Sequence, residues 1–408
     1  MKRLTAHSRR AMTLALATVA SVLAVRTGEA HKPITSKYTY NDDVFPVVRA
    51  KCGRCHVAGG IAPMSLMTYE EAFPWAESIR AELVASHMPP WGAQPGFGSF
   101  KHTERLTAEE LDILLTWATG GNPRGRPDQQ LPQVALGDAW PLGPPDLTIA
   151  LPAVAVPTDK MEQMEEFTVP TGVTETRWVR AVDLQPGTTS IVRSATIAVI
   201  DVDDTPFSPD RMLRRWVPGQ DPESLDRDGT AFELPAKAQL LVRVHYKKTW
   251  QFEGKSLKDA STIGLYFTNK PAASLLTVPI AEPAGTAPSG QILTFAQSID
   301  REVRALAISP DQIPPNIIIV ATAVLPDGTK TPLIRLNTRA DWSRRYWFDH
   351  PMLLPRGTKI EVVANLDDPN RLALAAFGGP IGPQAPPVTD GLRLSLNVLQ
   401  ARDVRSTP

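Results

Sequence analysis

Two cysteines and a histidine stand together in the segment KCGRCHVAGG, residues 51–60. Cys52 and Cys55 are the two cysteines of the 408-residue chain, and His56 follows the second one directly. A disulfide across two intervening residues closes a very short loop and removes little chain entropy from the unfolded state. A thioredoxin-like pair should open a helix, whereas here a helix capped by Asn41 is predicted to run into the motif. A zinc site needs further cysteine or histidine ligands at close spacing, and none follows nearby.

The spacing C-x-x-C-H is typical of covalent haem attachment. In such a site two thioethers, here from Cys52 and Cys55, hold the porphyrin. The adjacent His56 then supplies the proximal nitrogen to iron. We therefore predict one covalently bound haem c.

An electron-carrying haem iron has a second axial ligand, and a methionine there raises the reduction potential. We predict Met88, which stands in SHMPPWGAQPGFG. Pro89 and Pro90 should end the preceding helix and stiffen a loop that presents this side chain. Methionine is also a common core residue. The other candidate ligands from the same region are His87, His102, Met64 and Met67.

Two helices are predicted to flank the loop that carries Met88. Thr68 and Glu71 form a capping box that opens the helix before the methionine loop. Thr107 and Glu110 form a second box, and the Gly-Gly pair at 120–121 ends the helix that it opens. Motif helix, methionine loop and closing helix is an order that resembles small cytochromes c.

The first thirty residues have the pattern of an export signal. Basic residues within positions 1–10 precede an apolar run over 11–25, and small residues at 28–30 provide a cleavage site. The apolar run is shorter than the about 20 residues that a membrane-spanning helix needs. We predict a signal peptide over 1–30 and a periplasmic or exported mature chain from His31. After cleavage that chain is not expected to span a membrane.

Composition limits the remaining possibilities. With 42% hydrophobic and 21% charged residues, the chain resembles an ordinary soluble globular protein. Its 43 basic and 43 acidic residues balance, so nucleic acid is not an expected partner. The 39 prolines favour loops and β-edges over long helices.

The sequence beyond the closing helix changes to short β-branched or leucine-rich runs separated by turn residues. RMLRRW, residues 211–216, is interpreted as a solvated turn, with a basic docking edge as the alternative. Strands are predicted at 176–184, 190–200, 239–246, 315–324, 359–366 and 392–399. We predict a multidomain chain with a small all-α cytochrome c domain (31–125), a linker (126–150) and an all-β module of two jelly-roll-like β-sandwiches (151–285 and 286–408).

Six segments follow one another in an informative order: C-x-x-C-H, APMSLMTYEEAFPWAESIR, HMPPW, GDAWPLGPPDLTI, ELPAKAQLLVRVHY and LLPRGTKIEVVANLDD. Together they resemble exported bacterial proteins that fuse a cytochrome c domain to a module similar to copper type II, ascorbate-dependent monooxygenases. That family includes the peptidylglycine α-hydroxylating and dopamine β-monooxygenases. The resemblance is specific in the haem part and looser in the β part.

The resemblance implies two copper sites, one held by a histidine pair with a further histidine and one by a His-x-His pair with a methionine. After the linker the chain has only His245 and His350. His245 matches the single histidine of the first site, but Arg193 and Ser194 stand where its histidine pair is expected. Residues 302–309, where the His-x-His pair is expected, contain no histidine. We therefore expect no copper and a non-catalytic module.

These interpretations give a leading hypothesis and two alternatives. The first is a periplasmic monohaem c-type cytochrome that transfers electrons to or from a redox partner protein, with the β module used for docking or assembly. The second is a copper-dependent monooxygenase, an oxidoreductase, whose copper receives electrons from the haem. The third is a structural subunit of a periplasmic redox complex.

Overall fold

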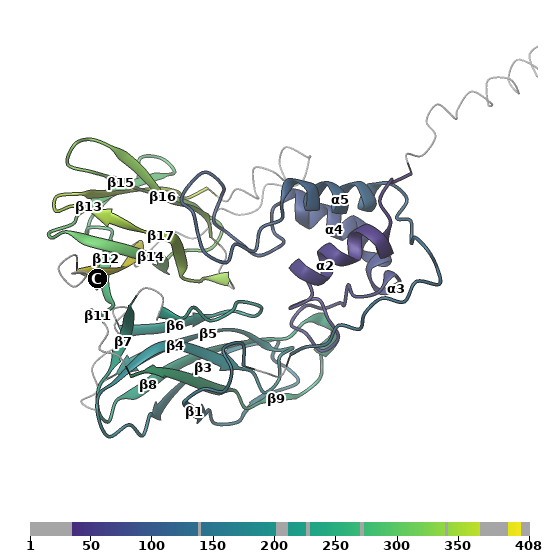
Figure 1. Cartoon of the computed structure of the whole chain (residues 1–408), viewed down its shortest axis with the longest axis horizontal. Coiled ribbons are helices and arrows are strands. Elements are labelled where there is room, and N and C mark those ends of the chain that lie inside the picture. The colour runs from purple at the N-terminus through teal and green to yellow at the C-terminus, as the bar shows by residue number, and fades with distance from the viewer. Residues whose placement is uncertain are drawn as a thin grey trace, which may run out of the picture.

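A short helical N-terminal part is followed by a large β-rich region, which confirms the coarse fold class predicted from the sequence (Figure 1). The computed structural model describes residues 35–137, 140–200, 211–225, 229–269, 273–338, 342–367 and 391–400. The predicted signal peptide and His31 lie outside these residues. Within them, no helix is long and apolar enough to cross a membrane.

The helical part begins with a π-helical turn whose N-cap is Thr39, which accepts a hydrogen bond from the Asp42 N–H. The predicted cap at Asn41 is wrong, because this residue is buried inside the turn and donates to the Arg126 carbonyl. The predicted box of Thr107 and Glu110 is confirmed. Thr68 also caps a helix by accepting from the Glu71 N–H, but the Glu71 carboxylate accepts from the hydroxyls of Ser65 and Thr68 and does not complete a box. The helices are η1 (Tyr40–Val44), α2 (Phe45–Lys51), α3 (Tyr69–Ala72), η2 (Phe73–Trp75), α4 (Ala76–Val84) and α5 (Ala108–Thr119).

The first β unit consists of two main sheets that enclose an apolar core, with a two-stranded ribbon beside them. One sheet has the order β1 (Leu147–Ala150), β10 (Thr262–Thr268), β4 (Arg177–Gln185), β7 (Thr230–Leu234) and β11 (Ala273–Ser274). The other has the order β3 (Glu162–Pro170), β8 (Gln239–Lys247), β5 (Val192–Ile200) and β6 (Met212–Trp216). The ribbon pairs β2 (Val154–Val156) with β9 (Leu257–Asp259), and η5 (Trp250–Phe252) follows β8.

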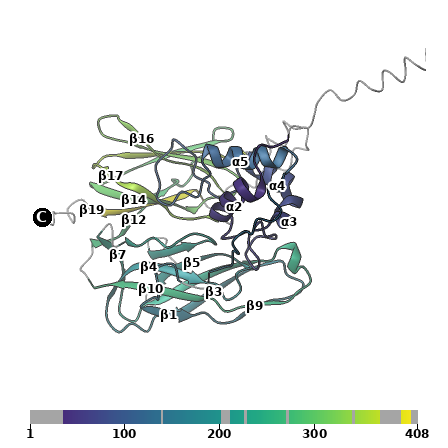
Figure 2. The same ribbon diagram turned by 45° about the vertical axis from the view of Figure 1, so that its right-hand side comes forward.

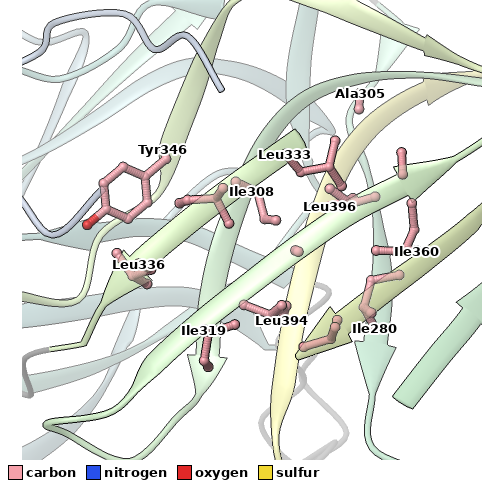
Figure 3. Packing of buried hydrophobic residues seen from close by; sticks show 14 of the residues in the cluster. Ile280, Ala305, Ile308, Ile319, Leu333, Leu336, Tyr346, Ile360, Leu394 and Leu396 are labelled. Carbon is pink, nitrogen blue, oxygen red and sulfur yellow. The ribbon is translucent and has the colours of Figure 1, made fainter. Parts of the chain in front are cut away.

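The second β unit has two four-stranded sheets around a separate core, part of which Figure 3 shows. One sheet has the order β12 (Leu276–Ala281), β19 (Arg393–Gln400), β14 (Val303–Gln312) and β17 (Tyr346–Leu354). The other has the order β13 (Ile292–Ser298), β18 (Lys359–Asn365), β15 (Ile318–Val324) and β16 (Lys330–Asn337). A smaller apolar cluster joins the two β units, with Leu225 and Trp347 among its members.

The six predicted strand segments are confirmed and correspond to β4, β5, β8, β15, β18 and β19. The interpretation of residues 211–216 as a solvated turn is wrong, because β6 is a strand whose five residues are all buried. Its two arginines lie inside the molecule: Arg214 donates to backbone carbonyls, and Arg215 pairs with Asp311 at 2.9 Å. The arginines indicated an exposed segment, but each guanidinium has partners inside the molecule and can therefore be buried.

One segment of the N-terminal part belongs structurally to the second β unit. Ala93 bridges to Leu336 of β16, and Phe100 bridges to Phe348 of β17. Both side chains enter the core of that unit, where Ala93 is 3% exposed and Phe100 is 9% exposed. The helices consequently stay beside both β units, as Figure 2 shows. The β region thereby helps to position the loop that follows Met88.

Candidate haem site

The C-x-x-C-H motif forms the turn that ends α2. Cys52 is the C-cap of this helix, and its carbonyl accepts hydrogen bonds from the N–H groups of Cys55 (3.0 Å) and His56 (2.8 Å). Both cysteines are free thiols. Burial raises the pKa of Cys52 to about 12, and burial followed by the charge of Glu104 raises the pKa of Cys55 to about 11. A redox-active thiol pair depends on a lowered pKa, so these thiols do not fit a thioredoxin-like site.

The imidazole of His56 has a defined orientation. Its Nδ1 lies 3.2 Å from the carbonyl oxygen of Met64, and a carbonyl can only accept a hydrogen bond, so Nδ1 carries the proton. Burial lowers the pKa of His56, which favours the neutral ring. The lone pair is then on Nε2. A ring that donates from one nitrogen to a carbonyl and keeps the other for a metal is the usual arrangement of a metal-ligating histidine.

Met88 is half-buried and lines a cavity of about 430 Å³. Leu83, Leu106 and Leu111 also line it, and these leucines pack in the same apolar cluster as Cys52. The other lining residues come from 86–95, from Arg105 and from Asn337 of β16, and residues 52–56 are not among them. The structure therefore brings the two cysteines and the histidine together. Met88 lies at a cavity that shares three leucines with the apolar cluster that contains Cys52.

The four alternative ligands have other contacts. Met64 and Met67 both pack in the helical core, and the Met67 sulfur lies beside Gly53 of the motif, 3.4 Å from where a Cβ would stand. The ring of His87 lies 3.1 Å from a Glu82 carboxylate oxygen. The ring of His102 lies 3.0 Å from a carboxylate oxygen of Glu223.

Residues of the first β unit cover the motif at Cys55. Arg54 donates to the Gly219 carbonyl at 2.9 Å and makes a two-pronged ion pair with Asp221, at 2.7 and 2.8 Å. The Cys55 sulfur lies 4.0 Å from the Pro218 carbonyl oxygen. A Cβ on Gly219 would stand 3.3 Å from that sulfur, so the loop and the motif are in close contact.

The second β unit contacts the segment that carries Met88 through Arg344, which precedes β17 and is 0% exposed. Its Nη1 pairs with Glu104 at 2.7 Å, and its Nη2 donates to the Pro90 carbonyl at 3.0 Å. The guanidinium lies 5.4 Å from the ring centre of Trp91.

Sequence reasoning identified the motif but missed these supporting residues. Arg54 and Asp221 are 167 positions apart, and Arg344 and Glu104 are 240 positions apart. An arginine in a β-rich stretch resembles any surface arginine until the fold shows its partners. The segment TRADWSRRYWF contains three arginines, at 339, 344 and 345. Nothing in this segment indicates that one of them contacts residues near the haem motif.

The residues of the β region do not fit the copper sites that the sequence resemblance implies. His245 of β8 lies opposite Ser194 of β5, so the matched positions are neighbours but provide a single imidazole. The Nε2 of that ring lies 2.7 Å from a Glu162 carboxylate oxygen. His350 is exposed on β17. Across the described ranges, no group of three or more His, Cys, Asp or Glu side chains is placed to hold a metal ion.

No protein-family model matches the chain, and no curated protein matches it. Among solved structures, an allantoicase is 11% identical with a TM-score of 0.17, over 60% of this chain and 78% of that one. A quasi-atomic model of the PBCV-1 virus capsid is 8% identical with a TM-score of 0.20, over 60% of this chain and 97% of that one. Likeness this slight carries no argument about the function of the chain.

Proposed function

We propose that this protein is an exported, periplasmic monohaem c-type cytochrome that transfers electrons. In this proposal Cys52 and Cys55 would hold haem c through thioethers, and His56 and Met88 would bind its iron. The observation that carries the proposal is the hydrogen bond from His56 Nδ1 to the Met64 carbonyl, beside two free, protonated thiols. It leaves the Nε2 lone pair available to a metal within the spacing that haem attachment requires.

Bound in this site, the haem supplies a one-electron couple between Fe(II) and Fe(III). The side chains of the site have separate tasks. His56 is oriented by its carbonyl partner, and the apolar cluster that contains Cys52 and Leu111 would limit the access of water to a bound haem. A site of low polarity disfavours the additional positive charge of the ferric state, so this environment raises the reduction potential.

The β region is proposed to consist of two jelly-roll-like sandwiches, with the scaffold of copper type II monooxygenases but without their copper ligands. In this proposal the region is non-catalytic and serves docking or assembly. Its partner is a periplasmic redox protein, held by the weak, transient contact expected for electron transfer. Asp221 pairs with Arg54 of the motif, and Arg344 pairs with Glu104 of the N-terminal part. These contacts support a role of the β region in holding the residues of the candidate haem site.

The two alternative functions lack a specific observation in their favour. A copper monooxygenase fed by the haem needs several imidazoles, and His245 lies with Ser194 and Glu162 instead. A structural subunit with an idle haem would have the same motif, so reduction of the haem by a partner protein distinguishes it.

The test is to produce the full chain in a periplasm with haem-attachment machinery and added copper. Iron and copper per chain are measured by elemental analysis, and covalent haem is detected on the denatured chain. We expect one iron, no stoichiometric copper and haem that stays attached after denaturation. A chain without attached haem would refute the proposal. One copper per chain would favour the monooxygenase instead.

A further inference from the structure

We propose that Arg344 is a positioning residue that holds the Met88 loop in place as an iron ligand. The second β unit then completes a site whose cysteines and histidine lie in the helical part. This inference rests on the proposed function above and adds which residue holds Met88 in position to bind the iron. Four groups of contacts carry it.

The first group is made by the guanidinium itself. Arg344 is fully buried, and its Nη2 donates at 3.0 Å to the carbonyl of Pro90, two residues after Met88. The cation also lies 5.4 Å from the ring centre of Trp91, within the range of a cation–π contact. These two contacts restrict the positions of Pro90 and Trp91, the residues that follow Met88 in the loop.

The second group is the strand-like pairing that follows. The Asn337 N–H donates to the Gly92 carbonyl at 3.0 Å, and the Gln94 N–H donates to the Arg335 carbonyl at 2.8 Å. A Cβ on Gly92 would stand 2.6 Å from the Asn337 carbonyl oxygen, so only glycine allows this close approach. The backbone after Met88 is thus attached to β16.

The third group is aromatic. The rings of Trp91 and Tyr346 are 5.2 Å apart and nearly perpendicular, and those of Phe100 and Tyr346 are 5.6 Å apart. Tyr346 and Leu336 belong to the core of the second β unit, as Figure 3 shows. The loop that follows Met88 is therefore packed against the core of the second β unit, and these contacts restrict its movement.

The fourth group links Arg344 to the helical part. Its Nη1 pairs with Glu104 at 2.7 Å. The next residue, Arg105, accepts a hydrogen bond through its carbonyl from Lys51 Nζ at 3.1 Å, and Lys51 directly precedes Cys52 of the motif. The ion pair therefore connects the methionine loop with the segment that contacts the end of α2.

The test compares Arg344→Lys with the wild-type holoprotein. Lysine keeps the positive charge but has one ammonium group, which cannot reproduce the two separate Nη contacts. We expect covalent haem to be retained, the methionine-to-iron(III) charge-transfer band to weaken, and the reduction potential to fall. Affinity of the ferric haem for added imidazole should rise about tenfold, as the competing methionine is held less well.

Arg345→Lys is the matched control. Arg345 is adjacent and also buried, but its donors contact the carbonyls of Met212 (2.7 Å) and Leu213 (3.1 Å) in β6. We expect this variant to leave the band and the imidazole affinity unchanged. An equal change in both variants would show general loosening and overturn the positioning role.

Glu104→Gln is the second variant, because it weakens the same ion pair at a partly exposed side chain and does not depend on the folding of an Arg344 variant. It should shift the band and the imidazole affinity in the same direction, by a smaller factor. Wild-type values in both variants would refute the inference while leaving the haem protein in place. Failure of the proposed function has a different signature, since the wild-type chain would then carry no covalent haem, and this inference would fall with it.

Discussion

The two halves of the candidate haem site are attached to the β region by different forces. On the motif side, Arg54 and Asp221 form an ion pair whose side chains are 56% and 43% exposed. On the methionine side, Ala93 and Phe100 are buried in the core of the second β unit. Exposed ion pairs contribute little to stability and weaken with salt, whereas a buried aromatic side chain contributes several kcal/mol. The methionine half is therefore the more firmly attached.

The difference shows where each half obtains its geometry. The motif is shaped locally, because the Cys52 carbonyl accepts the N–H groups of Cys55 and His56 and the Met64 carbonyl orients the ring. The methionine loop has local hydrogen bonds too, from the Met88 N–H to the Glu82 carbonyl (3.4 Å) and from the Trp91 N–H to the Pro89 carbonyl (2.7 Å), but it is in addition paired with β16 and β17. Attachment of the haem and the choice of its second ligand should consequently respond to different substitutions.

The largest expected effect is on attachment. Replacing both Cys52 and Cys55 by serine removes the two thiols that form thioethers, so covalent haem should be lost completely. The fold should persist, because the cores of the two β units are separate from the helical cluster. Haem staining after denaturing electrophoresis measures attachment, and circular dichroism checks the fold. Full retention of haem in the double variant would refute the attachment claim.

The next effect is on the methionine side. Phe100→Ala leaves a cavity in the core of the second β unit and should lower the free energy of unfolding by about 3–5 kcal/mol. Haem should stay attached, but the methionine-to-iron(III) band should weaken because the loop loses its anchor. Guanidinium denaturation and visible spectroscopy measure both.

Phe73→Ala provides the control for this prediction. Phe73 lies in the helical part and is 46% exposed, so its loss should cost less than about 1 kcal/mol and leave the band unchanged. Equal effects of the two phenylalanine substitutions would remove the distinction between the two halves of the site.

The same distinction explains what the sequence could predict. The helix caps at Thr68 and Thr107 and the C-x-x-C-H spacing depend on residues within a few positions of one another, so they are visible in the sequence. The burial of β6 was not visible, because the partners of Arg214 and Arg215 are supplied by tertiary structure. Residues 91–102 contain no regular pattern, and their pairing with β16 and β17 needs the fold to be known.

A third, pH-dependent effect concerns the first β unit, which contacts the motif through Asp221. Asp183 of β4 is buried, and burial raises the pKa of its carboxyl from 3.8 to about 6. Since the folded state then binds this proton more tightly than the unfolded state, the contribution to stability falls as the pH rises from 3.8 to 6. Asp183→Asn does not titrate, so relative to wild type it should gain about 3 kcal/mol between pH 3 and pH 7, at about 1.4 kcal/mol for each pKa unit.

The measurement is denaturant unfolding of both proteins across this pH range. Arg214 attracts the Asp183 carboxylate and so lowers the pKa that burial raises, and the net value of about 6 already includes this attraction. Parallel stability curves for the two proteins would contradict the prediction. The methionine-to-iron(III) band should not change, because Asp183 lies in the first β unit.

The smallest effect tests the exposed ion pair directly. Single and double substitution of Arg54 and Asp221 by alanine should give a coupling free energy below about 1 kcal/mol, and the coupling should decrease further in 1 M salt. A coupling of several kcal/mol that survives salt would mean that the motif is held as firmly as the methionine loop. A small coupling would instead mean that contacts other than this ion pair, among them the close contact of Gly219 with Cys55, keep the first β unit on the motif. Gly219→Ala would then disturb the motif more than either alanine in the ion pair, because the added Cβ stands 3.3 Å from the sulfur on a backbone with φ of 78°.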